Sequence, residues 1–138
     1  MSFELTPDLR EKLDSERIVW LTTVSPMGQP MPRPVWFLWD GEALVVYTSR
    51  ETAKLRHIDA NPRVTVHFNA DRDGSDVVVL IGRAERVADP VPPSRYPGYL
   101  DKYSDGLSTI GYTVEKLDLM LPAALRVVPH RSWSPPEP

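Results

Sequence analysis

The stretch PMPRPVWFLWDGEALVVYTSRETAKLRHI, residues 30–58, decides the predicted fold. At its centre lies Asp40-Gly41, a dipeptide common in tight turns because both residue types tolerate positive φ, and an apolar run stands on each side of it. The pattern predicts a β-hairpin. After the second run the apolar spacing changes from two to three or four residues, at Leu55 and Ile58. We therefore expect a short helix to begin where the second strand ends.

The first turn of this helix combines features that attract an anion. Free N–H groups and the positive end of the helix dipole favour negative charge at a helix N-terminus. Arg50 and Lys54 add two cations, and Ser49 and Thr52 add hydroxyl groups. We predict a phosphate-binding corner here. An ordinary solvated helix face accounts for the two cations equally well, so the residue pattern by itself leaves both interpretations open.

The rest of the chain predicts further short strands and helices. Strands are expected at 17–24, 31–39, 64–70, 76–87 and 122–128, of which 76–87 is the longest. Helices are expected from Thr6-Pro7, over 99–103 and over 113–120. Sequentially adjacent strands joined by tight turns favour an antiparallel sheet that curls into a barrel. The predicted class is mainly β (α+β), with short helices flanking the barrel.

Proline and glycine refine this prediction. Pro32 and Pro34 cannot donate to a ladder, so their strand belongs at an edge of the sheet. Gly82, inside the predicted strand 76–87, marks a bulge or bend. The C-terminal residues 131–138 are predicted to form a mobile tail.

Composition limits the function. The 138 residues suit one domain, 1–138, and the net charge of -3 gives no electrostatic case for nucleic-acid binding. The absence of cysteine excludes disulfides, cysteine-ligated metals and a thiol nucleophile. The N-terminal residues lack the layout of a secretory signal, and no window approaches the ~20 apolar residues that span a bilayer. We therefore expect a cytoplasmic protein with no membrane partner.

Histidine and tryptophan give weaker signals. The spacing of His57, His67 and His130 matches no metal site, so we predict no metal and treat all three as surface or interface residues. No residue is assigned as a catalytic acid, base or nucleophile. Trp36 is expected near a ligand, and Trp20 is expected to be structural.

Several short motifs in this order carry a family resemblance. They are PVWF (34–37) before the hairpin, then Tyr47-Thr48-Ser49, Thr52-x-Lys54 and Asn61-Pro62-Arg63-Val64. Together they resemble the pyridoxamine 5'-phosphate oxidase-like flavin and deazaflavin oxidoreductases. Within that superfamily the chain is most similar to the small single-domain enzymes that use the deazaflavin cofactor F420 and are common in actinobacteria. The resemblance extends from the first helix to the last strand.

This resemblance implies an FMN-binding split β-barrel that forms a homodimer, with cofactor sites at the subunit interface. Two sets of residues would bind the cofactor. Those expected along the ring are Arg33, Pro34, Val35 and Trp36. Those expected along the ribityl chain, phosphate and tail are Thr48, Ser49, Arg50, Thr52, Ala53, Lys54 and Arg56. Trp133 would reach the partner's cofactor site, or else close its own barrel.

One departure from the family pattern bears on the cofactor. FMN-dependent members usually place Ser-Arg-Lys at the helix start, and here the triplet is Thr52-Ala53-Lys54, with Arg50 as a candidate replacement for the missing cation. This favours F420, whose tail carries a phosphodiester and glutamates, over FMN. The terminal arginine pattern of true pyridoxamine phosphate oxidases is absent from RVVPHRSW (126–133), so that reaction is not expected.

The expected function is therefore an F420H2-dependent oxidoreductase that passes a hydride to a small conjugated organic acceptor. An FMN-dependent reductase or oxidase of the same fold is one alternative. A non-catalytic protein that binds F420, FMN or haem is another, and a dimeric scaffold without a cofactor is the last.

Overall fold

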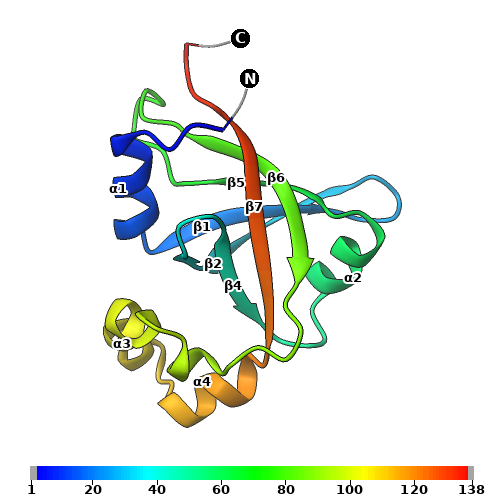
Figure 1. Ribbon diagram of the computed structural model, residues 1–138, viewed down its shortest axis with the longest axis vertical. Helices are drawn as coiled ribbons and strands as arrows, with labels where there is room; N and C mark the ends of the chain where they lie inside the picture. The colour runs from blue at the N-terminus through cyan, green and yellow to red at the C-terminus, as the bar shows by residue number, and fades with distance from the viewer. Residues whose placement is uncertain (1–2, 137–138) are drawn as a thin grey trace.

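The computed structural model describes residues 3–136 and has one seven-stranded antiparallel sheet that curls into a split barrel (Figure 1). The strand order is β2-β1-β5-β6-β7-β4-β3. The strands are β1 (Ile18–Val24), β2 (Pro30–Trp36), β3 (Leu38–Trp39), β4 (Leu44–Thr48), β5 (Arg63–His67), β6 (Val79–Arg86) and β7 (Ala123–Trp133). The helices are α1 (Pro7–Ser15), α2 (Ala53–Ala60), the 3-10 turn η1 (Pro93–Arg95), α3 (Tyr99–Ile110) and α4 (Val114–Met120). The predicted mainly β class and antiparallel split barrel are confirmed.

Alternation along the strands divides the sheet into an inner and an outer face. On β1, Val19, Leu21 and Thr23 are buried, while Trp20 and Thr22 are only partly covered and lie on the outer face. The inner residues form the main core together with apolar side chains of α1 and α2. No helix within residues 3–136 is long and apolar enough to cross a membrane.

β2 is an edge strand, as its prolines predicted. It pairs only with β1, in a register that places Thr22 opposite Pro32. Proline has no N–H to give to a ladder. The carbonyl groups of Pro30 and Pro32 instead accept hydrogen bonds from the side chains of Gln29 and Arg33, at 3.3 and 2.7 Å.

A second, smaller core forms where α3 and α4 pack against the sheet, at the bottom of Figure 1. Tyr99, Tyr103 and Leu107 of α3 and Leu117 of α4 are buried there. They pack against Tyr47 and other outer-face residues of β4 and β7. This contact fixes the helices to the end of the barrel at which β2 and β4 finish.

The central hairpin is present, but its turn differs from the prediction. The loop between β3 and β4 has four residues, Asp40 to Ala43, and only Gly41 has a positive φ, +101°. The Asp40 carboxylate accepts from the N–H groups of Glu42 and Ala43, at 2.9 and 2.8 Å. This side-chain acceptor stabilises the four-residue loop. The hairpin therefore does not need the two-residue turn with positive φ at both positions that Asp40-Gly41 suggested.

Several predicted boundaries were wrong, including those of the strands expected over 64–70 and 76–87, which span Arg63–His67 and Val79–Arg86. The strand expected over 31–39 is divided at Phe37 into β2 and β3. The helix expected over 99–103 continues to Ile110, where Gly111 ends it in a left-handed conformation. The longest strand is β7, which continues to Trp133, so residues 131–133 pair with β6 and are not part of a tail. Residues 137–138 of the predicted tail lie outside the described residues.

Candidate functional site

The predicted phosphate corner borders a cavity of about 210 Å³ between α2 and the edge formed by β1 and β2. We call it the α2 cavity. It is lined by Thr23, Met31, Arg33, Pro34, Thr52, Ala53, Lys54 and His57. Three separate elements therefore contribute its walls, and each is held by the sheet or the main core.

The N-cap and first turn of α2, Thr52 to Lys54, line this cavity. Thr52 is the N-cap residue, and its hydroxyl accepts from the Lys54 N–H at 3.4 Å. The remaining N–H groups of a first turn have no acceptor within the helix. No acidic residue lies in the first turn of α2 to neutralise them. The helix end is therefore a site of positive potential.

Lys54 belongs to this first turn, and Arg33 of β2 lines the same cavity. Within residues 3–136, no carboxylate oxygen lies within 4.0 Å of either side chain's nitrogen atoms. The pKa of Lys54 is lowered, first by its partial burial and second by the charge of Arg33. Two unpaired cations beside a helix N-terminus fit a phosphate group well.

His57 of α2 and Thr23 of β1 also line the α2 cavity. The Thr23 hydroxyl is buried, and it lies 2.9 Å from Nδ1 of His57. The sequence analysis treated His57 as a surface or interface residue and did not single out Thr23 or Met31. His57 follows Lys54 by three residues, a spacing that puts both on one helix face, and this signal could have found it.

Five of the residues predicted to bind a cofactor meet at the α2 cavity, and others do not. Those that meet are Arg33, Pro34, Thr52, Ala53 and Lys54. Arg50 lines a different cavity, of about 490 Å³, beside Arg86 and Asp89. Arg56 is exposed and donates to the backbone carbonyl of Glu51 at 3.3 Å. The second cation beside Lys54 is therefore Arg33 and not Arg50.

The remaining predicted residues lie on neighbouring elements. Thr48 is buried in β4, opposite Ala123, and Ser49 follows it into the loop before α2. Val35 packs against the main core. Trp133 ends β7 and lies opposite Val79 of β6, so β5 and β6 separate it from β1.

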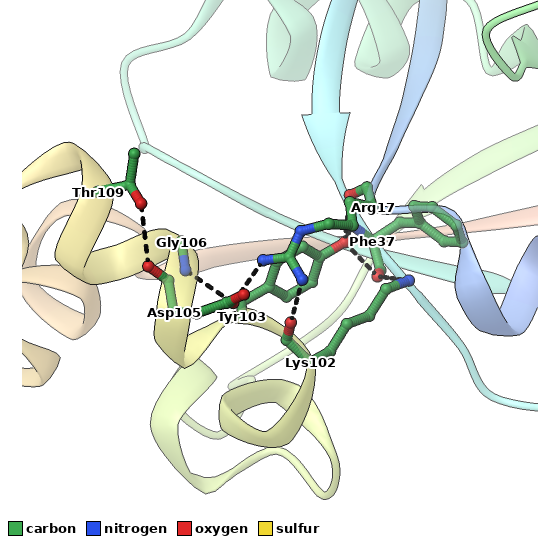
Figure 2. A network of polar contacts seen from close by, with 7 residues as sticks. All are labelled: Arg17, Phe37, Lys102, Tyr103, Asp105, Gly106 and Thr109. Atoms are coloured by element: carbon green, nitrogen blue, oxygen red, sulfur yellow. Dashed lines mark hydrogen bonds and ion pairs between the residues drawn. The ribbon is translucent and has the colours of Figure 1, made fainter.

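Trp36, at the end of β2, is held by α3. Its indole stacks on the Tyr103 ring, with centroids 4.4 Å apart and an interplanar angle of 5°. Figure 2 shows the Tyr103 ring reaching between Arg17 and Phe37. The Tyr103 hydroxyl accepts from the Phe37 N–H at 2.9 Å and lies 2.5 Å from the Arg17 carbonyl oxygen. Lys102 adds a hydrogen bond to the Phe37 carbonyl at 3.1 Å.

The arrangement can bind a compact anion at one end and a flat group beside β2. Arg33, Lys54 and the α2 amides supply positive charge at the anion. The outer edge of β2 pairs with no other strand. A ring with polar edges could lie along that edge and hydrogen-bond to backbone groups there.

The chain is similar in sequence and fold to known proteins. The family model described as Pyridoxamine 5'-phosphate oxidase matches residues 5–112. A solved structure named F420 reductase is 26% identical, with a TM-score of 0.65, and covers 90% of this chain and 94% of its own. No protein with a curated function matches the chain significantly.

Two further solved structures share the fold at lower identity. One is HutZ, described as a haem storage protein from Vibrio cholerae, at 16% identity and a TM-score of 0.64, covering 96% of this chain and 95% of its own. The other is an FAD-binding protein from Mesorhizobium loti, at 19% identity and a TM-score of 0.64, covering 96% and 92%. Proteins of this fold therefore bind more than one kind of planar cofactor.

Proposed function

The chain belongs to the pyridoxamine 5'-phosphate oxidase family, and from this premise we propose that it is an F420H2-dependent oxidoreductase acting on a small conjugated organic acceptor. Members of this fold include an F420 reductase and an FAD-binding protein. The proposal assigns the α2 cavity to the phosphate of the cofactor. Bound reduced deazaflavin would supply the hydride, and the protein would supply binding, orientation and exclusion of water.

One observation carries the proposal, namely the two unpaired cations of the α2 cavity. Arg126, for comparison, lies 2.8 Å from Asp40 and is paired. Arg33 and Lys54 face each other without such a partner, and burial works against the charge of Lys54. A bound phosphate would neutralise both. The fit is therefore chemical as well as geometric.

Each element near the cavity has a role in this proposal. Arg33, Lys54 and the Thr52 cap would hold the phosphate. The backbone of residues 34–36 would line the ring, and α3 would keep that backbone in place through Tyr103 and Trp36. No side chain is assigned as the proton donor to the product.

Two observations favour F420 over FMN. The helix start is Thr52-Ala53-Lys54, which lacks the cation that FMN-dependent members usually place in the middle of this triplet. The F420 reductase is also similar in sequence, at 26% identity over 90% of this chain. A site with room for one phosphate would also accept FMN, so an FMN-dependent reductase or oxidase is the second candidate.

We also propose that the protein acts as a homodimer with its cofactor sites at the interface. In its own subunit, Trp133 lies across β5 and β6 from the strand that borders the α2 cavity. A partner subunit could bring its own Trp133 to that cavity. Light scattering on the purified protein tests this proposal, because a monomeric mass would contradict it.

Anaerobic turnover tests the proposed activity. F420H2 is mixed with purified protein and a panel of quinones and nitroaromatic compounds, and its oxidation is followed by absorbance. We expect oxidation that depends on both protein and acceptor, and a loss of at least tenfold in kcat/KM with Lys54→Ala. Arg72→Gln, an exposed arginine in the loop before β6, is the matched control and should behave as wild type.

Two other results would change the assignment. Turnover with reduced FMN and none with F420H2 would favour the second candidate. Tight binding of either cofactor without turnover of any acceptor would identify a binding protein. If neither cofactor binds, the proposed function is wrong.

A further inference from the structure

A second and larger cavity, of about 700 Å³, lies on the outer face of the sheet. We call it the arginine groove. It is lined by Thr22, Val24, Pro30, Arg63, Val64, Thr65, Ile81, Gly82, Arg83, His130 and Arg131. The roles proposed for the α2 cavity use none of these residues.

Strand register brings the three arginines of the groove together. Arg63 of β5 lies directly opposite Arg83 of β6. The next row on the same face runs from Thr65 through Ile81 to Arg131. Residues directly opposite in an antiparallel pair have Cβ atoms about 4.5–5.5 Å apart, and diagonal neighbours are within reach of long side chains. Arg63 and Arg83 are therefore direct neighbours, and Arg131 lines the same groove.

A β-bulge adds His130 to this region. In the pairing of β6 with β7, Ile81 lies opposite Arg131 and Gly82 opposite Pro129, which leaves His130 as the extra residue. A bulge of this kind turns consecutive side chains toward one face, and His130 and Arg131 are both exposed lining residues.

Gly82 allows the two strands to approach at the bulge. A Cβ at this position would lie 2.3 Å from the carbonyl oxygen of Val128 and 2.9 Å from Cα of Pro129. Backbone atoms cannot move aside as a side chain could. The bulge and the direction of His130 are therefore built into the strand pair.

The positive charge of the groove is not balanced by the protein. Among residues 3–136, no carboxylate lies within 4.0 Å of the side-chain nitrogens of Arg63, Arg83 or Arg131. Like charges directly opposite each other destabilise a sheet. Elsewhere on β6 and β7 the arginines are paired, Arg86 with Asp59 and Arg126 with Asp40.

We propose that the arginine groove is a second anion-binding site, for a small molecule that carries two or more carboxylates or phosphates on an apolar frame. Guanidinium groups bind carboxylate and phosphate through paired hydrogen bonds. Several anionic groups are needed to neutralise three arginines. Val24, Pro30 and Ile81 give the groove an apolar floor on which such a frame can lie.

The groove and the α2 cavity approach each other at the edge of the sheet. Thr22 lines the groove and Thr23 lines the α2 cavity, on opposite faces of β1. On β2, Pro30 lines the groove and Met31 lines the α2 cavity. The anionic groups could therefore belong to the tail of a cofactor that passes around β2, or to a separate organic acid. The proposed groove site does not depend on the cofactor assignment.

Calorimetric titration with citrate, at constant ionic strength, tests the groove. We expect saturable citrate binding by wild type that includes one site per chain in the groove, at least tenfold weaker binding at that site in Arg83→Gln, and unchanged binding by Arg72→Gln. Arg63→Gln is the second variant, and circular dichroism checks that each variant is folded. Lys54→Ala removes a cation of the α2 cavity only, so the citrate binding that Arg83→Gln weakens should persist in Lys54→Ala, which separates this test from that of the α2 cavity.

Titration with F420 and FMN distinguishes the two sources of the anion. If the groove holds the tail of F420, Arg83→Gln weakens F420 binding, leaves FMN binding unchanged, and citrate competes with F420. If the groove holds a separate acid, F420 and FMN each bind Arg83→Gln as tightly as they bind wild type, and citrate binds at the same time as either cofactor. Equal citrate affinity in wild type, Arg63→Gln and Arg83→Gln would overturn the proposal. So would a change in oligomeric state in Arg83→Gln with citrate affinity unaltered, since the groove would then be an interface between subunits.

Discussion

Two effects oppose the positive charge of Lys54. Its side chain is partly buried on the first turn of α2, and Arg33 lies across the cavity. Both effects lower the pKa of Lys54 below the usual value of a lysine. This placement costs free energy, because Lys54 is partly buried and lies near the like charge of Arg33, whose side chain is exposed. The placement is understandable if an anion binds between the two residues.

The pKa of Lys54 should respond to its neighbour. In Arg33→Gln the opposing charge is lost, so the pKa of Lys54 should rise toward the usual lysine value while the effect of burial remains. Phosphate binding should raise it as well, because an anion favours the protonated amine. Anion affinity should therefore fall as the pH rises through the pKa of Lys54. NMR titration of lysine side chains, assigned with Lys54→Ala, measures both shifts, and an unchanged pKa in Arg33→Gln would contradict this description of the site.

The titration of Lys102 should make the free energy of unfolding depend on pH. Burial, and then the charge of Arg17, lower its pKa to about 8. Between that pH and the usual lysine value of 10.5 the unfolded chain binds more protons than the folded one, so the free energy of unfolding rises with pH. The side chain is partly solvated and its ammonium donates to the Phe37 carbonyl, so we expect a rise of only about 1 kcal/mol.

Urea unfolding of wild type and Lys102→Met at several pH values measures this contribution. Methionine fills similar volume and carries no charge, so the difference in stability between the two proteins isolates the titration of Lys102. The free energy of unfolding of wild type should increase relative to that of Lys102→Met as the pH rises above 8. A difference that is constant with pH would show that Lys102 does not titrate in this range.

At the scale of elements, α3 holds the junction of β2 and β3. The Tyr103 hydroxyl binds the Phe37 backbone, and the Trp36 ring stacks on Tyr103 (Figure 2). In Tyr103→Phe the stack remains and the buried Phe37 N–H loses its acceptor, which should cost about 2 kcal/mol. Chemical denaturation measures the loss. Tyr112→Phe, in the loop after α3, is the control; an equal loss in both variants would contradict a specific role for the Tyr103 hydroxyl.

The bulge between β6 and β7 depends on Gly82. Gly82→Ala would place a methyl group 2.3 Å from the Val128 carbonyl oxygen, so the strands must separate. We expect a loss of about 2–4 kcal/mol in the free energy of unfolding. Gly74→Ala, which meets no atom within 4 Å in an exposed loop, should cost about 1 kcal/mol because of its positive φ. Thermal and urea unfolding compare the stability of the two variants. Equal losses would contradict the claim that the close approach of the strands at Gly82 excludes a side chain.

Most elements could be predicted from local signals. Thr6 and Pro7 predicted the start of α1, the prolines of β2 predicted an edge strand, and Gly82 predicted the bulge. The end of β7 could not be predicted in this way. Residues 130–133 have no strong strand pattern of their own, and they are ordered by pairing with β6. Tertiary contact decided that boundary.

At the scale of the whole molecule, the site was only partly predictable. Lys54 and Thr52 were found because the motif is local to the start of α2. Arg50 was preferred as the second cation because it is close in sequence, but the fold places it at another cavity. Arg33 fills the position from a strand that is distant in sequence. The arginine groove was not predicted, because its residues come from five strands that meet only in the sheet.

The central claim is that the α2 cavity binds the phosphate of a cofactor, and the ratio of FMN to riboflavin affinity tests it most directly. The two compounds differ only in the phosphate, so the ratio isolates that group. Charge-assisted hydrogen bonds contribute about 1.5–3 kcal/mol, so wild type should bind FMN about 10–100 times more tightly than riboflavin. In Lys54→Ala and Arg33→Gln the ratio should fall toward one, with riboflavin affinity unchanged. A ratio that is the same in wild type and in both variants would contradict the claim.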